Sequence, residues 1–208
     1  MQITAQMVKD LRDATGAGPL DCKKALEQNG GDMQKAVDYL REKGLAKAVK
    51  KLGAGRIAND GIIQTYMHFN KRLGVLVEVN CETDFVAKTE QFQGFAYDIA
   101  LHIANLAPEF VRREDVPEAV VQAERELQKR RAMEEGKPET VAEKVAEGRM
   151  NKFFSEIVLM EQPFLKDDTK TISQLLQETV AAVGESIEIR RFARYALGEG
   201  SEDGASGE

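Results

Sequence analysis

The chain has 208 residues, enough for one compact domain or for a small module joined to a larger one. Apolar residues make up 42% and charged residues 31%, a balance typical of folded globular proteins and not of disordered ones. The net charge of −6 argues against general affinity for nucleic-acid phosphates, and the absence of an apolar run of about 18 residues argues against a membrane span.

The charge is unevenly distributed along the chain. Residues 1–58 contain 11 lysines and arginines against 7 acidic residues, a balance of +4, whereas the remainder has 18 against 28, a balance of −10. A basic amino-terminal piece on an acidic body indicates two modules with different partners. The first residues mix charges into a helical pattern without a hydrophobic signal core, so we expect a cytoplasmic protein.

The first fifty residues predict three short helices. The first ends at Gly16, and the second begins at Pro19 with Leu20 on its apolar stripe. The third ends just before Gly44, so that three apolar stripes can bury one another in a bundle of about 45 residues. Residues 45–60 follow as a basic helical tail and a glycine-containing linker, where we place a module boundary.

The next segments change to the two-residue period of β-strands. Strands are predicted at Gly61–His68 and Leu73–Asn80, joined by a short polar loop, and again at Ser186–Leu197. In the last strand Phe192 falls out of phase with the isoleucines before it. Either a bulge or a change of buried face is therefore required near Arg191.

Four helices are predicted between the second and third strands, at 89–106, 117–135, 138–157 and 171–183. The middle two form a helical hairpin over 117–157 whose arms would run to roughly 30 Å. The sequence thus predicts an α+β fold in which a helical bundle precedes a core with a three-stranded antiparallel sheet, packed helices and this hairpin. Residues 199–208 contain no large apolar side chain and are predicted to be a disordered acidic tail.

Motifs for catalysis and for cofactor binding are absent from the sequence. No phosphate-binding loop, dinucleotide-binding turn, metalloprotease helix or nucleophile elbow occurs, so we expect no enzymatic activity, no cofactor and no metal site. Cys22 and Cys81 lie far apart and are predicted to be free thiols. His102 is interpreted as a packed or rim histidine in preference to a ligand.

The most informative segment follows the second strand, where Thr83, Asp84 and Phe85 come at the end of the sheet. Two interpretations remain open. In the first, Thr83 or Asp84 caps a turn and Phe85 tucks into the core. In the second, Phe85 is a wedge that enters a partner's apolar crevice, while Asp84 repels phosphate oxygens or competes for a bound cation.

Three separated stretches resemble the elongation factor Ts family, whose members are guanine-nucleotide exchange factors for elongation factor Tu. They are VLVEVNCETDFVAKTEQF, TGAGPLDCKKALEQNGGDMQKAVDYLREKG and GKPETVAEKVAEGRMNKF, and the resemblance runs from about Ile3 to Leu197. It implies a ubiquitin-associated-like (UBA-like) bundle at residues 1–53 and a core domain at 54–198. The hairpin over 117–157 resembles the coiled-coil insertion of the family.

The resemblance also implies roles for individual residues. Thr83, Asp84, Phe85 and Val86 match the family's stretch that displaces the magnesium ion held with GDP on elongation factor Tu. The amino-terminal module is implied to dock on the partner's nucleotide-binding domain, and its candidate contact residues are Arg12, Gly16, Gly18, Cys22 and Lys23. Lys23 fits a solvated helix face equally well. His68 matches a histidine-bearing hairpin tip, which makes it a candidate partner contact or a plain loop residue.

The chain departs from long family members in having room for only one core subdomain. Short members pair two identical chains, so the resemblance implies a homodimer that engages two molecules of GDP-bound elongation factor Tu. An edge strand that needs a neighbour is consistent with this expectation. We expect no direct contact with nucleic acid or with membranes. The alternative function is a noncatalytic adaptor or chaperone that binds proteins through its small bundle.

Overall fold

The computed structural model describes residues 3–52 and 58–199 of the chain. The glycine-containing part of the predicted linker, with the module boundary between residues 53 and 54, lies outside the described residues, as does the predicted tail from residue 200 onward.

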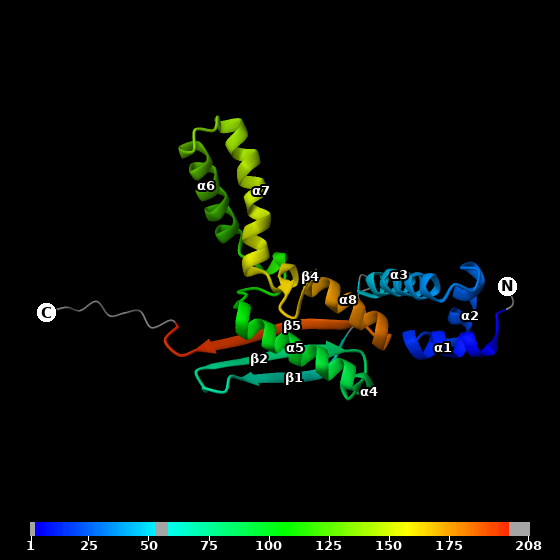
Figure 1. The fold of residues 1–208 in the computed structure, drawn as a ribbon. Helices are drawn as coiled ribbons and strands as arrows, with labels where there is room; N and C mark the ends of the chain where they lie inside the picture. Colours follow the sequence, from blue (N-terminus) through cyan, green and yellow to red (C-terminus); the bar gives the residue numbers. More distant parts are fainter. Residues whose placement is uncertain (1–2, 53–57, 200–208) are drawn as a thin grey trace.

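Three helices form the amino-terminal bundle: α1 (Ala5–Thr15), α2 (Pro19–Gln28) and α3 (Met33–Leu52). The first begins after Thr4, whose hydroxyl accepts a hydrogen bond from the helix, and ends at Gly16 in the left-handed conformation. The residues fully buried in the bundle are Leu11, Cys22, Ala25, Leu26 and Ala36. The bundle is blue in Figure 1 and lies beside one end of the sheet.

The third helix does not end before Gly44, as the sequence predicts, but continues through the predicted basic helical tail to Leu52, so the two form one helix. A side chain added at Gly44 would meet the Cβ of Ala181 at 3.5 Å, so the glycine lies where α3 packs against α8 (Ile172–Val183). A glycine inside a helix costs about 1 kcal/mol relative to alanine, and this packing offsets it. A helix-breaking residue therefore does not end a helix that a second element supports.

The central sheet contains β1 (Asp60–Met67), β2 (Leu73–Cys81) and β5 (Ile187–Ala196), antiparallel and in the order β1–β2–β5. These three strands confirm the predicted ones to within one residue at each end. The expected irregularity is a bulge in β5: Glu78 pairs with Arg191 and Val79 with Ile189, so Arg190 is the extra residue.

The main core lies between the inner face of this sheet and the helices α5 (Glu90–Leu106) and α8. Figure 1 shows α5, in green, running along the sheet, with the one-turn α4 (Asp84–Ala87) at the end of α5 that lies toward the bundle. His102 on α5 is fully buried, as the sequence favours. Its Nδ1 accepts the backbone N–H of Leu165 at 3.2 Å, so Nε2 carries the proton and donates to Gln162 at 2.9 Å.

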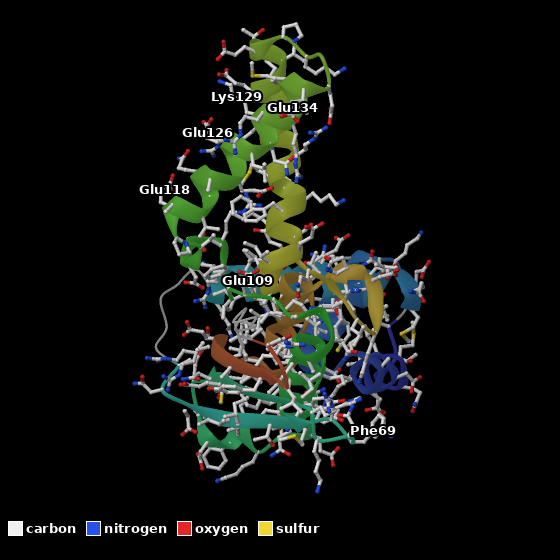
Figure 2. The ribbon with its side chains drawn as sticks, turned by 90° about the vertical axis from the view of Figure 1, so that its left-hand side faces the viewer. Phe69, Glu109, Glu118, Glu126, Lys129 and Glu134 are labelled. Carbon is white, nitrogen blue, oxygen red and sulfur yellow. The ribbon has the colours of Figure 1, made fainter. Side chains whose placement is uncertain are left out.

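A helical hairpin of α6 (Glu118–Glu134) and α7 (Glu139–Ile157) projects from the core (Figure 1). Alanines at the interface let its arms approach closely, and charged side chains, Glu118, Glu126 and Lys129 among them, lie along it (Figure 2). The Lys129 ammonium bridges two α7 carboxylates near the tip, each at 2.9 Å. Within the described residues, no helix is both long and apolar enough to span a membrane.

The remaining elements are short and follow or precede the hairpin. Two 3₁₀ turns, Arg113–Asp115 and Leu159–Glu161, flank it. A second sheet pairs β3 (Pro163–Phe164) with β4 (Asp167–Thr171), which the sequence analysis missed because neither strand alternates apolar and polar residues over a useful length.

Candidate functional site

The segment that contains the predicted wedge, residues 83–86, is called the wedge segment below. It lies where β2 leaves the sheet and α4 begins. The strand directs Val77, Val79 and Cys81 into the core, which fixes the direction in which the chain emerges. Thr83 is the N-cap of α4, and its hydroxyl accepts a long hydrogen bond of 3.5 Å from the backbone of Val86. Val86 packs partly against the main core, so the segment has a buried side and an exposed side.

Thr83 is held through all of its polar atoms. Its backbone N–H and its hydroxyl donate to the two carboxylate oxygens of Glu185, at 3.0 Å and 2.8 Å. Its carbonyl accepts the thiol of Cys81 at 3.1 Å. Burial raises the pKa of the Cys81 thiol, which keeps the thiol protonated and able to donate.

Phe85 extends from this anchored base into solvent, with 80% of its surface exposed. The carboxylate of the neighbouring Asp84 accepts a hydrogen bond from the ammonium of Lys88 at 2.6 Å. That hydrogen bond and charge hold the pKa of Asp84 below its ordinary value, so the carboxylate is ionised at neutral pH. Of the two interpretations of the sequence, the cap at Thr83 is confirmed, whereas the expectation that Phe85 tucks into the core is wrong.

The candidate residues of the amino-terminal module gather at the turn between α1 and α2, with one exception. Arg12, Gly16, Gly18 and Lys23 are exposed there. Cys22 is fully buried in the bundle core, and its thiol donates to the carbonyl of Ala17 at 3.4 Å, so its side chain supports the turn and presents no surface.

Leu20 is the residue of this turn that sequence reasoning misplaced. It was expected on the apolar stripe of the second helix, but 74% of its surface is exposed, because Cys22 and Leu26 occupy the inward positions of α2. An exposed leucine beside Lys23 and two backbone-exposing glycines offers a partner both apolar surface and positive charge. The proline that opens the helix marks Leu20 as a residue of the first turn, but which side of that turn faces solvent depends on the packing of Cys22 and Leu26.

His68 lies at the other end of the sheet, in the turn between β1 and β2, so the structure does not bring it together with the wedge segment (Figure 1). Its Nδ1 is 3.0 Å from the hydroxyl of Tyr66, and its ring lies 4.4 Å from the ring of Phe69. Phe69, labelled in Figure 2, is 87% exposed. Lys71 adopts the left-handed conformation, with φ of 58°, to close the turn.

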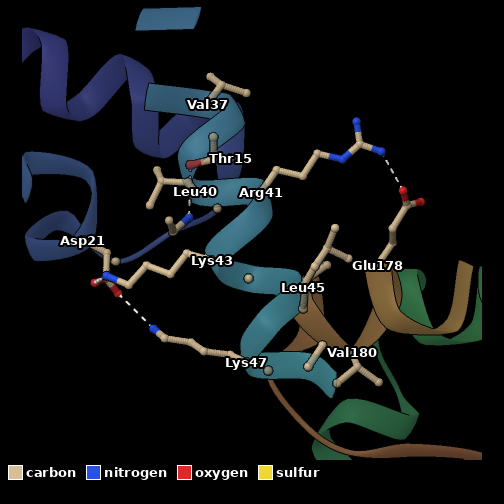
Figure 3. Close-up of a pocket in the computed structure, with 18 of the residues that line it drawn as sticks. Thr15, Asp21, Val37, Leu40, Arg41, Lys43, Leu45, Lys47, Glu178 and Val180 are labelled. Carbon is tan, nitrogen blue, oxygen red and sulfur yellow. Dashed lines mark hydrogen bonds and ion pairs between the residues drawn. The ribbon is translucent and has the colours of Figure 1, made fainter. Parts of the chain in front are cut away.

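A groove of about 650 Å³ separates the bundle from α8 and is lined by several cations (Figure 3). The carboxylate of Asp21 accepts a hydrogen bond from the ammonium of Lys43 at 3.2 Å and forms an ion pair with Lys47 at 3.6 Å. The guanidinium of Arg41 forms an ion pair with Glu178 at 2.7 Å. Three of the four cations thus have a carboxylate partner inside the groove, and the fourth, Lys51, donates to the carbonyl of Gly184. We therefore interpret the groove as the joint between bundle and core. Among the described residues, no cluster of three or more His, Cys, Asp or Glu side chains is arranged to hold a metal.

Comparison with known proteins places the chain in a family. The family model described as "Elongation factor TS" matches residues 5–199. The elongation factor Ts of Carboxydothermus hydrogenoformans is 58% identical over 198 residues, which cover 95% of this chain and 90% of that protein. Its counterpart in Geobacter metallireducens is 58% identical over 200 residues, which cover 96% of this chain and 92% of that protein. The chain belongs to the elongation factor Ts family and is a translation elongation factor.

Proposed function

We propose that this chain is a guanine-nucleotide exchange factor for elongation factor Tu and makes no covalent change of its own. It promotes GDP release by disturbing the site that holds magnesium and phosphates in the partner. The observation that supports this most is Phe85, an exposed aromatic side chain on a base fixed by hydrogen bonds, next to an ionised carboxylate. A protein that needs to enter another protein's site benefits from such preorganisation.

The energetics follow from reciprocal coupling. If the complex stabilises a partner conformation in which GDP and its magnesium lose ligands, the factor weakens nucleotide binding as much as the nucleotide weakens the complex. Each 1.4 kcal/mol of coupling changes affinity about tenfold, and burial of a phenylalanine supplies roughly 2 kcal/mol. Asp84 adds charge repulsion toward phosphate oxygens or competes for the cation. The remaining coupling comes from other contacts.

The amino-terminal module supplies the second contact in this proposal. The bundle and α4 lie beyond the same end of the sheet in Figure 1, so one partner molecule can touch both. Leu20 provides the apolar contact and Lys23 a positive charge. The basic balance of residues 1–58 favours a fast approach to an acidic partner surface.

We also propose that two chains pair through the outer face of the sheet, which supports a complex of two factors with two molecules of elongation factor Tu. Large apolar side chains are exposed there, on neighbouring strands: Ile63, Met67, Leu76 and Tyr195. A face of this kind suits a self-complementary interface. Light scattering at micromolar concentration should give a dimer for the natural chain and a monomer for Leu76→Asp. A monomeric mass for the natural chain would remove this part of the proposal.

The exchange activity is tested by following fluorescent GDP on elongation factor Tu in a stopped-flow instrument. Addition of the chain with excess unlabelled GDP should accelerate the fluorescence change, with a rate that saturates as the chain concentration rises. An unchanged release rate, together with binding of the two proteins, would contradict exchange activity and favour the adaptor function.

A further inference from the structure

Glu185 lies far from the wedge segment in sequence but next to it in space. It follows Gly184, the left-handed residue that ends α8, with φ of 79°. This conformation, which glycine adopts without strain, turns the chain back toward the end of β2. The carboxylate then spans 102 positions of sequence to reach the base of the wedge at Thr83.

The carboxylate meets two donors of a single residue, which fixes orientation as well as position. One oxygen accepts the backbone N–H of Thr83 at 3.0 Å and the other accepts its hydroxyl proton at 2.8 Å. Because the hydroxyl gives its proton to Glu185, its lone pairs face the N–H of Val86 at the start of α4. Glu185 therefore orients the hydroxyl of Thr83 that caps α4.

The support of Glu185 itself comes from two directions. The ammonium of Lys51, in the last turn of α3, donates to the carbonyl of Gly184. The backbone N–H of Ser186 donates to the carboxylate of Glu82 at 2.8 Å, so the chains before Thr83 and after Glu185 are tied together reciprocally. The last turn of α3, a helix of the amino-terminal bundle, thus contacts the residue directly before Glu185, which in turn binds Thr83.

The geometry points to Glu185 as a positioning residue for nucleotide release: it does not touch the partner but holds Thr83 so that Phe85 and Asp84 leave the surface in one direction. This inference rests on the proposed exchange function. We call the two hydrogen bonds from Thr83 to the Glu185 carboxylate the clamp. When the clamp is broken, α4 samples several orientations, and only a fraction of complexes present Phe85 in the orientation that enters the partner. The release rate at saturation should fall, while docking through the bundle is retained.

The first test is local and does not depend on exchange. In Glu185→Gln a neutral amide replaces the carboxylate, so both hydrogen bonds lose their charged acceptor and the one with the Thr83 hydroxyl must reverse its direction, which weakens the hold on Thr83. Hydrogen exchange of the peptide that contains residues 82–87 should accelerate by about tenfold or more, equivalent to about 1.4 kcal/mol of protection. Unchanged protection of this peptide would overturn the clamp. Glu161→Gln is the matched control, since Glu161 also accepts two hydrogen bonds, from Arg113 at 2.6 Å each, beside the helical hairpin.

The second test separates positioning from folding. Glu185→Gln should lower the saturating GDP release rate about tenfold, with a concentration for half-saturation within about twofold of the natural chain. Thr83→Val removes the hydroxyl donor and should resemble Glu185→Gln, and the double variant should be no slower than the slower single one. Equal release rates for Glu185→Gln and Glu161→Gln would overturn the inference while leaving the exchange function intact. If the natural chain fails to accelerate release, the exchange function and with it the positioning role are both contradicted.

Discussion

The two ends of the central sheet each present an exposed phenylalanine, but they hold it in different ways. Phe85 lies two residues after Thr83, whose polar atoms are bound by Cys81 at the end of β2 and by Glu185 just before β5. Phe69 lies in a turn held by the ring of His68 and by backbone bonds within the hairpin, and a long-range bond, from the N–H of Leu197, reaches the carbonyl of Arg72 at the end of this turn. Both ends expose a phenylalanine, but only at the end proposed to act on the partner does a distant carboxylate, that of Glu185, bind two donors of a residue close to it.

The largest expected effect comes from removing each phenylalanine in turn. Phe85→Ala should slow the saturating GDP release by about thirtyfold, the equivalent of roughly 2 kcal/mol of lost burial in the partner. Phe69→Ala removes the same surface at the other end and should stay within about threefold of the natural rate. Stopped-flow release with both variants at matched folded fractions checks this. Equal losses at the two ends would break the comparison.

A smaller effect is expected at the turn between α1 and α2. Leu20→Ser removes an exposed apolar side chain from the proposed docking surface, so the concentration for half-saturation should rise about tenfold while the saturating rate is unchanged. Val49→Ser on α3 is the control, because Val49 is also exposed but lies outside that turn. A loss of the saturating rate in Leu20→Ser would mean that the bundle takes part in release and not only in docking.

The smallest effect concerns stability and pH. Burial lowers the pKa of His102 from its ordinary value of 6.5, so the unfolded chain binds a proton before the folded chain does. Stability is therefore retained above pH 6.5 and is lost as the pH falls below it, by at most about 1 kcal/mol between pH 6.5 and 5.5 for this one group. Urea unfolding across this range measures the change. His102→Gln should flatten the dependence, and if His68→Asn flattens it instead, the assignment to His102 is wrong.

Patterns within short stretches of sequence predicted the elements whose formation depends mainly on neighbouring residues. The alternation of apolar residues located all three strands of the central sheet, and the out-of-phase Phe192 indicated the bulge, observed at Arg190. The fate of Gly44 was not predictable in this way, because its neighbour in the fold is Ala181 of α8, more than a hundred residues away. Helix termini follow local rules unless tertiary packing overrides them.

The site shows the same limit more clearly. The residues Thr83–Val86 were found from their position after a strand and from their resemblance to a family motif. Whether Phe85 is buried could not be decided, since the answer depends on which side of α4 meets the core. Glu185 carried no signal at all: a single glutamate after a helix-ending glycine is common, and its role depends on the strand end that it faces.

The central claim is that the side chain at position 85 enters elongation factor Tu beside the bound nucleotide. It is tested most directly by replacing Phe85 with a photo-crosslinking phenylalanine analogue, irradiating the complex and identifying the attached peptide by mass spectrometry. We predict attachment to the nucleotide-binding domain of elongation factor Tu, next to the residues that hold magnesium and phosphate. Attachment within this chain itself, or to a different domain of the partner, would contradict the account.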